Sequence, residues 1–393
     1  CSMGYISLRM KRFCGFITGF VFFLSGIVKL MDPVGAGLVM DEYFSFLHIS
    51  FLSFSAKAFG VFFALTETII GAALITGVWR KVTAVCAIVL QAFFTLLTLL
   101  LVIFNPEMDC GCFGEAIHLT HLQTFIKNII LLALLLAYYI PHDQLGETLK
   151  KKYVSFGLVT VSVIAFTIYS LIYIPLIDFT AYRPGAELEA GAQVNADDMY
   201  ESIFTYEKDG IQETFTLGHL PDSTWTFVSV DTRLKKGYEE SLTGLSFYAS
   251  QTGEYQDKLA IEGKVMVISV YNPDMKKDKW TQIEAFATRA SKAGFRVLLL
   301  CASQEGIPAS LQEQAYISDY KTLISLNRSN GGITYFYNGQ LIRKWASINT
   351  PDASQLQAIA ETGPTEISIE QDNKGSLVFQ GFLLYVFAVM LLM

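Results

Sequence analysis

The chain of 393 residues is too apolar for a wholly water-soluble protein. Hydrophobic residues make up 52% of the sequence and charged residues 17%, whereas a typical soluble protein has about 25% charged residues. The net charge of −7 and the lack of any long run of Lys or Arg argue against a face that binds nucleic acid. The 13% of aromatic residues excludes a disordered chain.

Six apolar segments are long enough to cross a membrane, which takes about 17–25 residues of helix. They are Phe13–Leu30, Ala56–Val78, Val82–Phe104, Leu122–Ile140, Val154–Ile174 and Leu377–Met393. We predict an α-helical membrane bundle, with four helices in 1–150, a fifth span and stalk in 151–177, and a sixth span in 375–393. Between the last two lies a polar, extramembrane domain. Because the sixth segment is short, we expect the polypeptide to continue past Met393.

Positive charges at the ends of the spans predict the orientation. The clusters Arg9–Arg12, Arg80–Lys81 and Lys150–Lys152 all fall on one side, whereas the loops at 31–52 and 105–120 carry acidic residues. The positive side of a multi-pass protein faces the cytoplasm. We therefore expect a cytoplasmic N-terminus, an inner-membrane location and a large periplasmic domain. The lipid bilayer is the first predicted partner.

The motif Cys110-Gly111-Cys112 lies in the predicted outer loop, on the side where disulfides persist. A disulfide that closes so small a ring adds little stability, and a strained or exposed disulfide is readily reduced. These arguments favour a redox-active pair, with a structural pair and a metal-binding pair as alternatives. For zinc, His118 and His121 would have to complete the site, but this spacing matches no common zinc motif. We therefore predict no metal site.

Glu67 is a carboxylate near the middle of the second span. An ionisable group there costs at least about 2.5–3.5 kcal/mol and usually faces the bundle interior with a partner. Thr66 and Thr68 point to other faces of the helix, so the partner must come from another helix. A structural polar contact and a proton-relay role both fit Glu67.

Three stretches of the membrane half carry a family resemblance. They are Arg12–Gly26 with Lys29-Leu30-Met31-Asp32-Pro33-Val34-Gly35, Glu67 with Gly71, and Asp109–Gly114 followed by Thr124–Asn128. Together they resemble the DoxX/MauE superfamily of four-helix membrane proteins, of which MauE is the methylamine utilisation branch. MauE proteins are associated with the periplasmic maturation of a disulfide-rich enzyme. The resemblance therefore implies thiol–disulfide chemistry at the membrane surface.

The polar domain divides into two predicted parts. Residues 178–260 form a linker and a β-rich region, in which Lys208-Asp209-Gly210 indicates a hairpin turn. Residues 261–365 alternate strand and helix, with buried strands at Lys264–Tyr271 and Phe295–Cys301, helices at Trp280–Ala293 and Pro308–Ala315, and a final hairpin at Thr334–Trp345. The predicted order is β-α-β-α-β-β, an α/β domain.

This second part resembles the thioredoxin-like domains that are fused to DoxX/MauE proteins. Ser329–Thr334 and Asn338–Trp345 carry the resemblance. A thioredoxin has Cys-x-x-Cys after its first central strand, where this chain has Tyr271–Asp278 without a cysteine, and Gly331 replaces the usual cis-proline. We therefore expect a redox-silent domain that binds a client protein or partner.

Two hypotheses for function follow from these patterns. In the first, Cys110 and Cys112 exchange disulfides with a periplasmic client, and Glu67 relays protons. The reduced pair then needs an electron acceptor, for which a quinone in the bundle is a candidate, although no residue pattern locates one. In the alternative, the protein is a non-enzymatic scaffold or accessory subunit of a larger membrane complex in the envelope.

Overall fold

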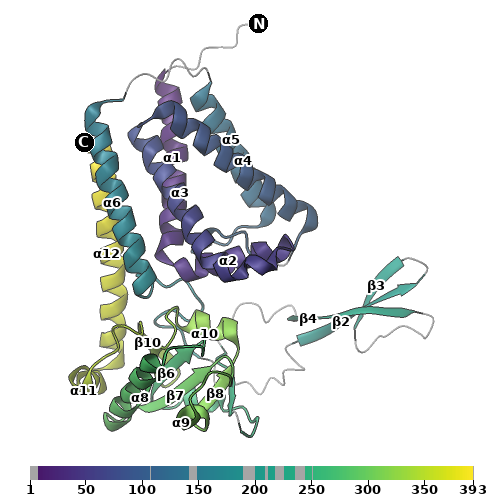
Figure 1. The fold of residues 1–393 in the computed structure, drawn as a ribbon, viewed down its shortest axis with the longest axis vertical. Helices are drawn as coiled ribbons and strands as arrows, with labels where there is room; N and C mark the ends of the chain where they lie inside the picture. The colour runs from purple at the N-terminus through teal and green to yellow at the C-terminus, as the bar shows by residue number, and fades with distance from the viewer. Residues whose placement is uncertain are drawn as a thin grey trace. The chain divides into compact units, whose positions relative to one another are not determined.

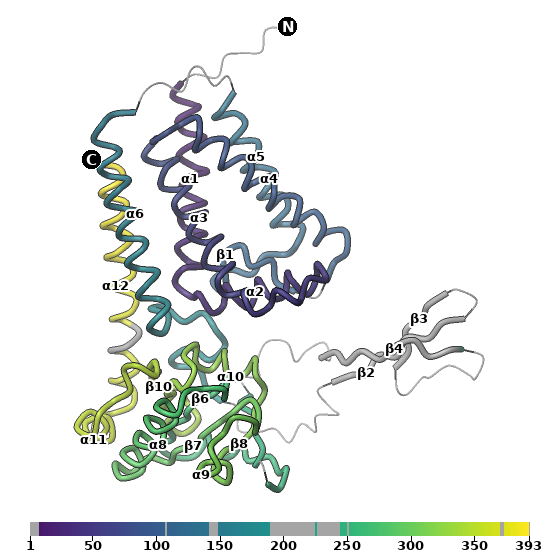
Figure 2. The backbone as a smooth tube through the Cα atoms, in the orientation of Figure 1, coloured from purple at the N-terminus to yellow at the C-terminus, as the bar shows by residue number. Residues whose placement is uncertain are grey.

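The computed structural model describes residues 8–106, 108–140, 148–188, 200–208, 211–216, 225–234, 244–249 and 251–392 (Figures 1 and 2). The chain forms two compact units. The helical unit contains the described residues up to Thr180, together with Trp345–Asn349 and the chain from Ile369 onward. The sheet-containing unit comprises Ala181–Lys344 and Thr350–Ser368.

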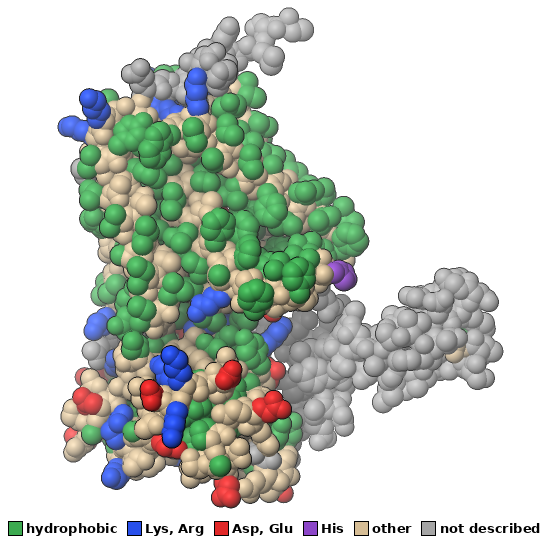
Figure 3. All heavy atoms as spheres, viewed as in Figure 1, with side chains coloured by type: hydrophobic (Ala, Val, Ile, Leu, Met, Phe, Trp, Pro, Cys, Tyr) green, Lys and Arg blue, Asp and Glu red, His purple; other side chains and the backbone are tan. Residues whose placement is uncertain are grey.

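The six predicted spans are confirmed as helices. Each is long and apolar enough to cross a membrane. Large hydrophobic side chains are exposed on them, Val82, Val161 and Leu384 among them, and cover the visible face of the helical unit (Figure 3). The helices are α1 (Leu8–Met31), α3 (Ala56–Thr76), α4 (Arg80–Phe104), α5 (His121–Tyr139), α6 (Lys150–Ile172) and α12 (Pro364–Leu392).

Helices α1 and α3 pack closely because glycines remove side chains from their interface. A Cβ placed on Gly71 of α3 would lie 2.5 Å from the backbone nitrogen of Phe23 and 2.8 Å from the carbonyl oxygen of Gly19. Small residues of this kind let two membrane helices approach until their backbones touch. The short distance between α1 and α3 then allows polar side chains of the two helices to meet.

The connection at 31–52 between the first two spans is mostly helical. Helix α2 covers Pro33–Phe46, and a 3-10 helix, η1, covers Ser50–Ser55. Asp32 caps α2 by accepting a hydrogen bond from the Gly35 backbone at 2.9 Å, and Pro33 occupies the first helical position, where it needs no donor. In the loop between α4 and α5, a short strand, β1, covers Cys112–Glu115.

The last helix is longer than its predicted span. α12 begins at Pro364 rather than near Leu377 and has 29 residues, because polar residues before the apolar segment also adopt helix. It packs along α6 within the helical unit. Ser155 donates a hydrogen bond to the Val389 carbonyl at 2.6 Å, and the rings of Phe166 and Phe382 stack at 4.6 Å.

The larger sheet of the other unit has six strands in the order β10-β9-β6-β7-β8-β5. β6 is parallel to β7 and antiparallel to β9, and the buried residues Val267, Leu300 and Phe336 belong to its core. The strands are β5 (Phe247–Ala249), β6 (Lys264–Val270), β7 (Arg296–Cys301), β8 (Ala315–Ser318), β9 (Gly332–Tyr337) and β10 (Gln340–Trp345); the helices are α8 (Lys277–Lys292), α9 (Ala309–Gln312), α10 (Tyr320–Leu326) and α11 (Ala353–Glu361).

The predicted order β-α-β-α-β-β omits one strand, β8, and two helices, α10 and α11. After α9, which ends at Gln312, β8 pairs with both β7 and β5. Helix α10 follows, capped by Asp319, whose side chain accepts from the Thr322 backbone at 2.9 Å. Four residues of strand are too few to show a periodicity, so only their pairing partners identify β8.

The two strands of the predicted hairpin near Lys208 are confirmed. β2 (Tyr200–Lys208) pairs antiparallel with β3 (Ile211–Thr216), with Lys208 opposite Ile211. The turn residues Asp209 and Gly210 lie outside the described residues. β4 (Thr226–Leu234) pairs with the other edge of β2 and completes a three-stranded sheet.

The contact between α1 and α3 predicts a strong effect of side-chain size at Gly71. Gly71→Val should destabilise the protein by about 1–3 kcal/mol or more, since the new side chain meets fixed backbone atoms. The matched control is Gly157→Val on α6, where nothing lies within 4 Å of an added Cβ. Thermal unfolding in one detergent measures both variants, and equal losses would contradict the close packing.

Candidate functional site

The Cys110-Gly111-Cys112 segment lies in the loop between α4 and α5, and β1 begins at Cys112. Gly111 has a φ of 59°, a left-handed conformation that favours glycine, and a Cβ there would collide with Val39 of α2. Cys110 is buried, Cys112 is partly exposed, and both are free thiols. The two thiols therefore differ in their access to an approaching molecule.

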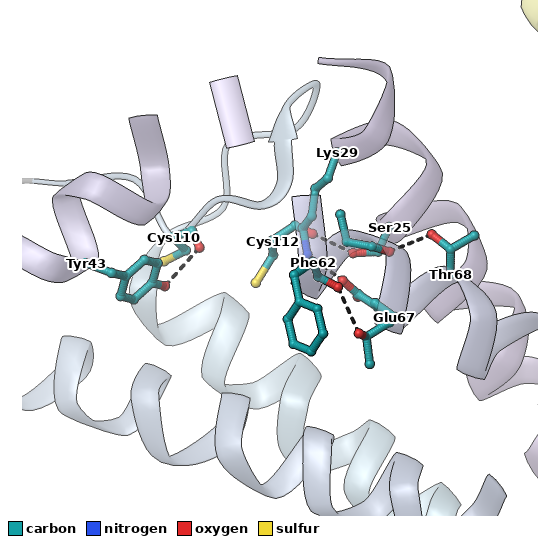
Figure 4. A network of polar contacts seen from close by, with 10 residues as sticks. Ser25, Lys29, Tyr43, Phe62, Glu67, Thr68, Cys110 and Cys112 are labelled. Atoms are coloured by element: carbon teal, nitrogen blue, oxygen red, sulfur yellow. Dashed lines mark hydrogen bonds and ion pairs between the residues drawn. The ribbon is translucent and has the colours of Figure 1, made fainter. Parts of the chain in front are cut away.

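Side chains from two helices hold the backbone of both cysteines. The Tyr43 hydroxyl of α2 donates a hydrogen bond to the Cys110 carbonyl at 3.0 Å. The Ser25 hydroxyl of α1 donates to the Cys112 carbonyl at 2.6 Å. Figure 4 shows Tyr43 beside Cys110, and Ser25, Lys29 and Glu67 around Cys112. The cysteine loop is thus hydrogen-bonded to a helix at each cysteine.

Glu67 finds its partner on another helix, as expected. Lys29 of α1 places its Nζ 2.7 Å from Oε2 of Glu67, and their side chains are 16% and 7% exposed. The Lys29 ammonium also lies 5.8 Å from the centre of the Phe94 ring. Each charge of this pair offsets the cost of placing the other inside the bundle.

A second polar cluster joins α4 to α5. Gln91 donates a hydrogen bond to the Asn128 carbonyl at 3.1 Å, and the Asn128 amide donates to the Thr98 hydroxyl at 3.1 Å. Sequence reasoning missed this cluster, although uncharged amides in apolar helices are a recognisable signal of helix-to-helix hydrogen bonding.

All three predicted site residues line one cavity of about 390 Å³ in the helical unit. Cys110 and Cys112 contribute from the loop, Glu67 from α3, and Lys29 from α1. Phenylalanine and aliphatic side chains make up much of the rest of the wall, which also includes Ser25, Tyr43, Gln91, Thr98, Lys127 and Asn128. The tertiary structure therefore joins a dithiol and a buried ion pair in one mostly apolar chamber.

Burial raises the pKa of the Cys110 thiol, and the Thr124 hydroxyl partly opposes this rise. Burial also raises the pKa of Tyr43, helped by the nearby cysteines and Glu42. At neutral pH, Cys110 is consequently a protonated thiol. Since Cys112 is the more exposed sulfur, it is the one an external thiol or disulfide can reach.

The two histidines near the motif have other partners. His118 pairs with Asp109 at 3.0 Å, and Nε2 of His121 lies 2.9 Å from the Met108 carbonyl. Within the described part of the chain, no three His, Cys, Asp or Glu side chains gather in a metal-binding arrangement.

The sheet-containing unit carries no thiol at the end of its first central strand. Residues 271–276 connect β6 to α8, and Cys301 is fully buried in β7, where burial raises its pKa to about 12. The Cys110–Cys112 pair belongs to the helical unit.

These features define a multi-pass membrane protein whose helices enclose a cavity lined by two cysteines. Residues 7–141 match the family of methylamine utilisation protein MauE. This match confirms the resemblance to MauE for the membrane region. Residues 200–237 match a domain of unknown function (DUF8463). No curated protein and no solved structure matches the chain.

If Lys29 and Glu67 compensate each other's charge, replacing one of them should destabilise the protein more than replacing both. Lys29→Met leaves Glu67 without its countercharge and should cost about 3 kcal/mol, whereas Lys29→Met combined with Glu67→Leu should regain most of that loss. Unfolding in detergent measures both. The control is His118→Ala, which breaks an exposed pair worth at most about 1 kcal/mol. A double variant less stable than Lys29→Met would contradict the interaction.

The two thiols should also differ in reactivity. In the reduced protein at pH 7.5, iodoacetamide should modify Cys112 several-fold faster than Cys110, as resolved by mass spectrometry of each site. Because its pKa is raised, Cys110 forms a thiolate only at higher pH. The rate at which iodoacetamide modifies Cys110 should therefore still increase above about pH 8.5, the usual pKa of a thiol. Equal rates for both cysteines at pH 7.5 would refute the assignment.

Proposed function

We propose that this protein exchanges disulfides with client proteins at the membrane surface through Cys110 and Cys112. The observation that carries the proposal is the single cavity shared by both thiols and the Lys29–Glu67 pair. A purely structural disulfide would need neither a chamber beside it nor a charged pair in its wall.

The exchange follows from the unequal access of the two sulfurs. A client thiolate attacks Sγ of Cys112 in the oxidised pair, which forms a mixed disulfide and releases Cys110 as a thiolate that takes up a proton. A second client thiolate then attacks the client sulfur of the mixed disulfide. The client leaves with a disulfide, and Cys110 and Cys112 remain as two thiols.

The Tyr43 and Ser25 hydrogen bonds support this role. They hold the carbonyls of Cys110 and Cys112 while the S–S bond forms and breaks. The raised pKa of Cys110 keeps that sulfur a protonated thiol at neutral pH. A thiol of raised pKa is also the stronger nucleophile once deprotonated, so Cys110 can reverse the first step and release a client that supplies no second thiol.

For the sheet-containing unit, we propose a thioredoxin-like core that binds the client without exchanging disulfides itself. The strand order β10-β9-β6-β7, with β9 antiparallel to β6, supports this assignment. The segment before α8 lacks the cysteines of an active thioredoxin. A client strand could add to an open sheet edge by ordinary backbone pairing.

The orientation that accompanies this function places the N-terminus in the cytoplasm and the Cys110–Cys112 loop in the periplasm. Lys and Arg side chains gather at one end of the helical unit (Figure 3), where Arg80 lies close to Arg12 and Lys152 donates to the Met390 carbonyl at 2.9 Å. This asymmetry supports an inner-membrane protein by the positive-inside rule.

Trapping of mixed disulfides tests the exchange. In cells that express Cys110→Ser, Cys112 should form covalent adducts that disappear on reduction in gel electrophoresis, since no neighbouring thiol releases the client. After a brief reduction with the outer membrane permeabilised, a membrane-impermeant maleimide should block the free Cys112 thiol and prevent the adducts from forming again. Cys112→Ser should give far fewer.

The control is the variant with both cysteines replaced by serine. If Cys110→Ser gives no more reducible adducts than this double variant, the exchange is refuted and the scaffold role is favoured. If the maleimide modifies periplasmic thiols but the adducts still form again after the reduction, the proposed orientation is refuted.

A further inference from the structure

We propose that the cavity binds a lipid-soluble quinone, which takes electrons from the reduced Cys110–Cys112 pair. This inference rests on the proposed function and names the molecule that regenerates its disulfide. It adds a binding site in the membrane helices to the exchange site at the loop.

The size and lining of the cavity fit a flat apolar ring. Its volume of about 390 Å³ lies within the range of sites for small organic ligands, which are mostly apolar with a few placed polar groups. On one wall, the parallel rings of Phe63 and Phe93 stack at 5.9 Å, and Phe94 lies 6.2 Å from Phe63. A planar ring can pack against these aromatic faces.

The polar groups of the cavity are those that a quinone would use. Lys29 has three N–H donors, of which one is bonded to Glu67 at 2.7 Å. As a quinone accepts electrons, negative charge develops on its oxygens, and a fixed ammonium that donates a hydrogen bond stabilises that charge. Glu67 holds the ammonium in place within the apolar wall.

The position of the cavity favours an acceptor dissolved in the membrane. Its walls come from α1, α3, α4 and α5, which are all candidate spans, together with α2 and the cysteine loop. Both Cys110 and Cys112 are part of that wall, so no carrier is required between the dithiol and the bound ring. A charged, water-soluble acceptor would lose its hydration among these phenylalanines without enough polar partners.

The reaction balances as a two-electron transfer. The two S–H bonds of Cys110 and Cys112 break and the S–S bond forms, which releases two electrons and two protons. The quinone takes both electrons, and its two oxygens form two O–H bonds, giving the quinol. Lys29 hydrogen-bonds to one quinone oxygen, and any proton it passes on is replaced by one of the two released by the thiols.

The test uses the full chain, purified in detergent, reduced, freed of reductant and kept without oxygen. A short-chain ubiquinone or menaquinone analogue is then added. We expect one quinol and the loss of two thiols per chain, measured by quinone absorbance and by thiol titration. The variant with both cysteines replaced by serine should form no quinol but should still be labelled in the cavity by a photoreactive quinone.

Two adjacent leucines of α4 offer a matched pair of variants. Leu97 lines the cavity, so Leu97→Trp should fill it and lower both quinol formation and photolabelling at least tenfold. Leu96 is 57% exposed and is not part of the cavity wall, so Leu96→Trp should behave as the unmodified protein. Equal effects of the two substitutions would overturn the proposed site.

The outcome also separates this inference from the proposed function. If Cys110→Ser traps clients but excess quinone leaves the dithiol reduced and no photolabel enters the cavity, the quinone site is refuted and the exchange stands. The same holds if mass spectrometry finds only membrane lipid in the cavity. If quinone oxidises the dithiol but no client adduct forms, the quinone site stands and the client exchange is refuted.

Discussion

The structure of the helical unit depends on the ion pair between Lys29 and Glu67. An isolated charge in the interior of a membrane bundle is costly, and the opposite charge on a neighbouring helix reduces that cost. The pair spans α1 and α3, which approach closely because glycines such as Gly71 leave their backbones in contact. The charge pair and the small residues thus require one another.

The same contact positions the cysteine loop. Ser25 lies one helical turn before Lys29 on α1 and donates to the Cys112 carbonyl, so the helix that carries the lysine also anchors the thiol. Helix α2, which begins immediately after α1, supplies Tyr43 for the Cys110 carbonyl. A short segment of chain from Ser25 to Tyr43 therefore sets the geometry of ion pair, dithiol and cavity together.

Much of the architecture is readable from residue patterns. Apolar length predicts the six membrane helices, and the cost of a buried carboxylate predicts that Glu67 has a partner on another helix. Other features depend on contacts between distant residues. Lys29 as that partner and the four-residue strand β8 both require knowledge of which segments pack or pair, and local periodicity does not contain it.

By itself, the sequence determined a membrane bundle with an extramembrane α/β domain and a close cysteine pair in a loop, because helix length, apolar content and residue spacing are local properties. Only the tertiary structure decided that Cys110, Cys112, Lys29 and Glu67 line a common cavity. These residues come from two helices and a loop, and Lys29 and Cys112 are 83 positions apart along the chain. Only the packing of α1 against α3, and of the loop against α1 and α2, brings them together.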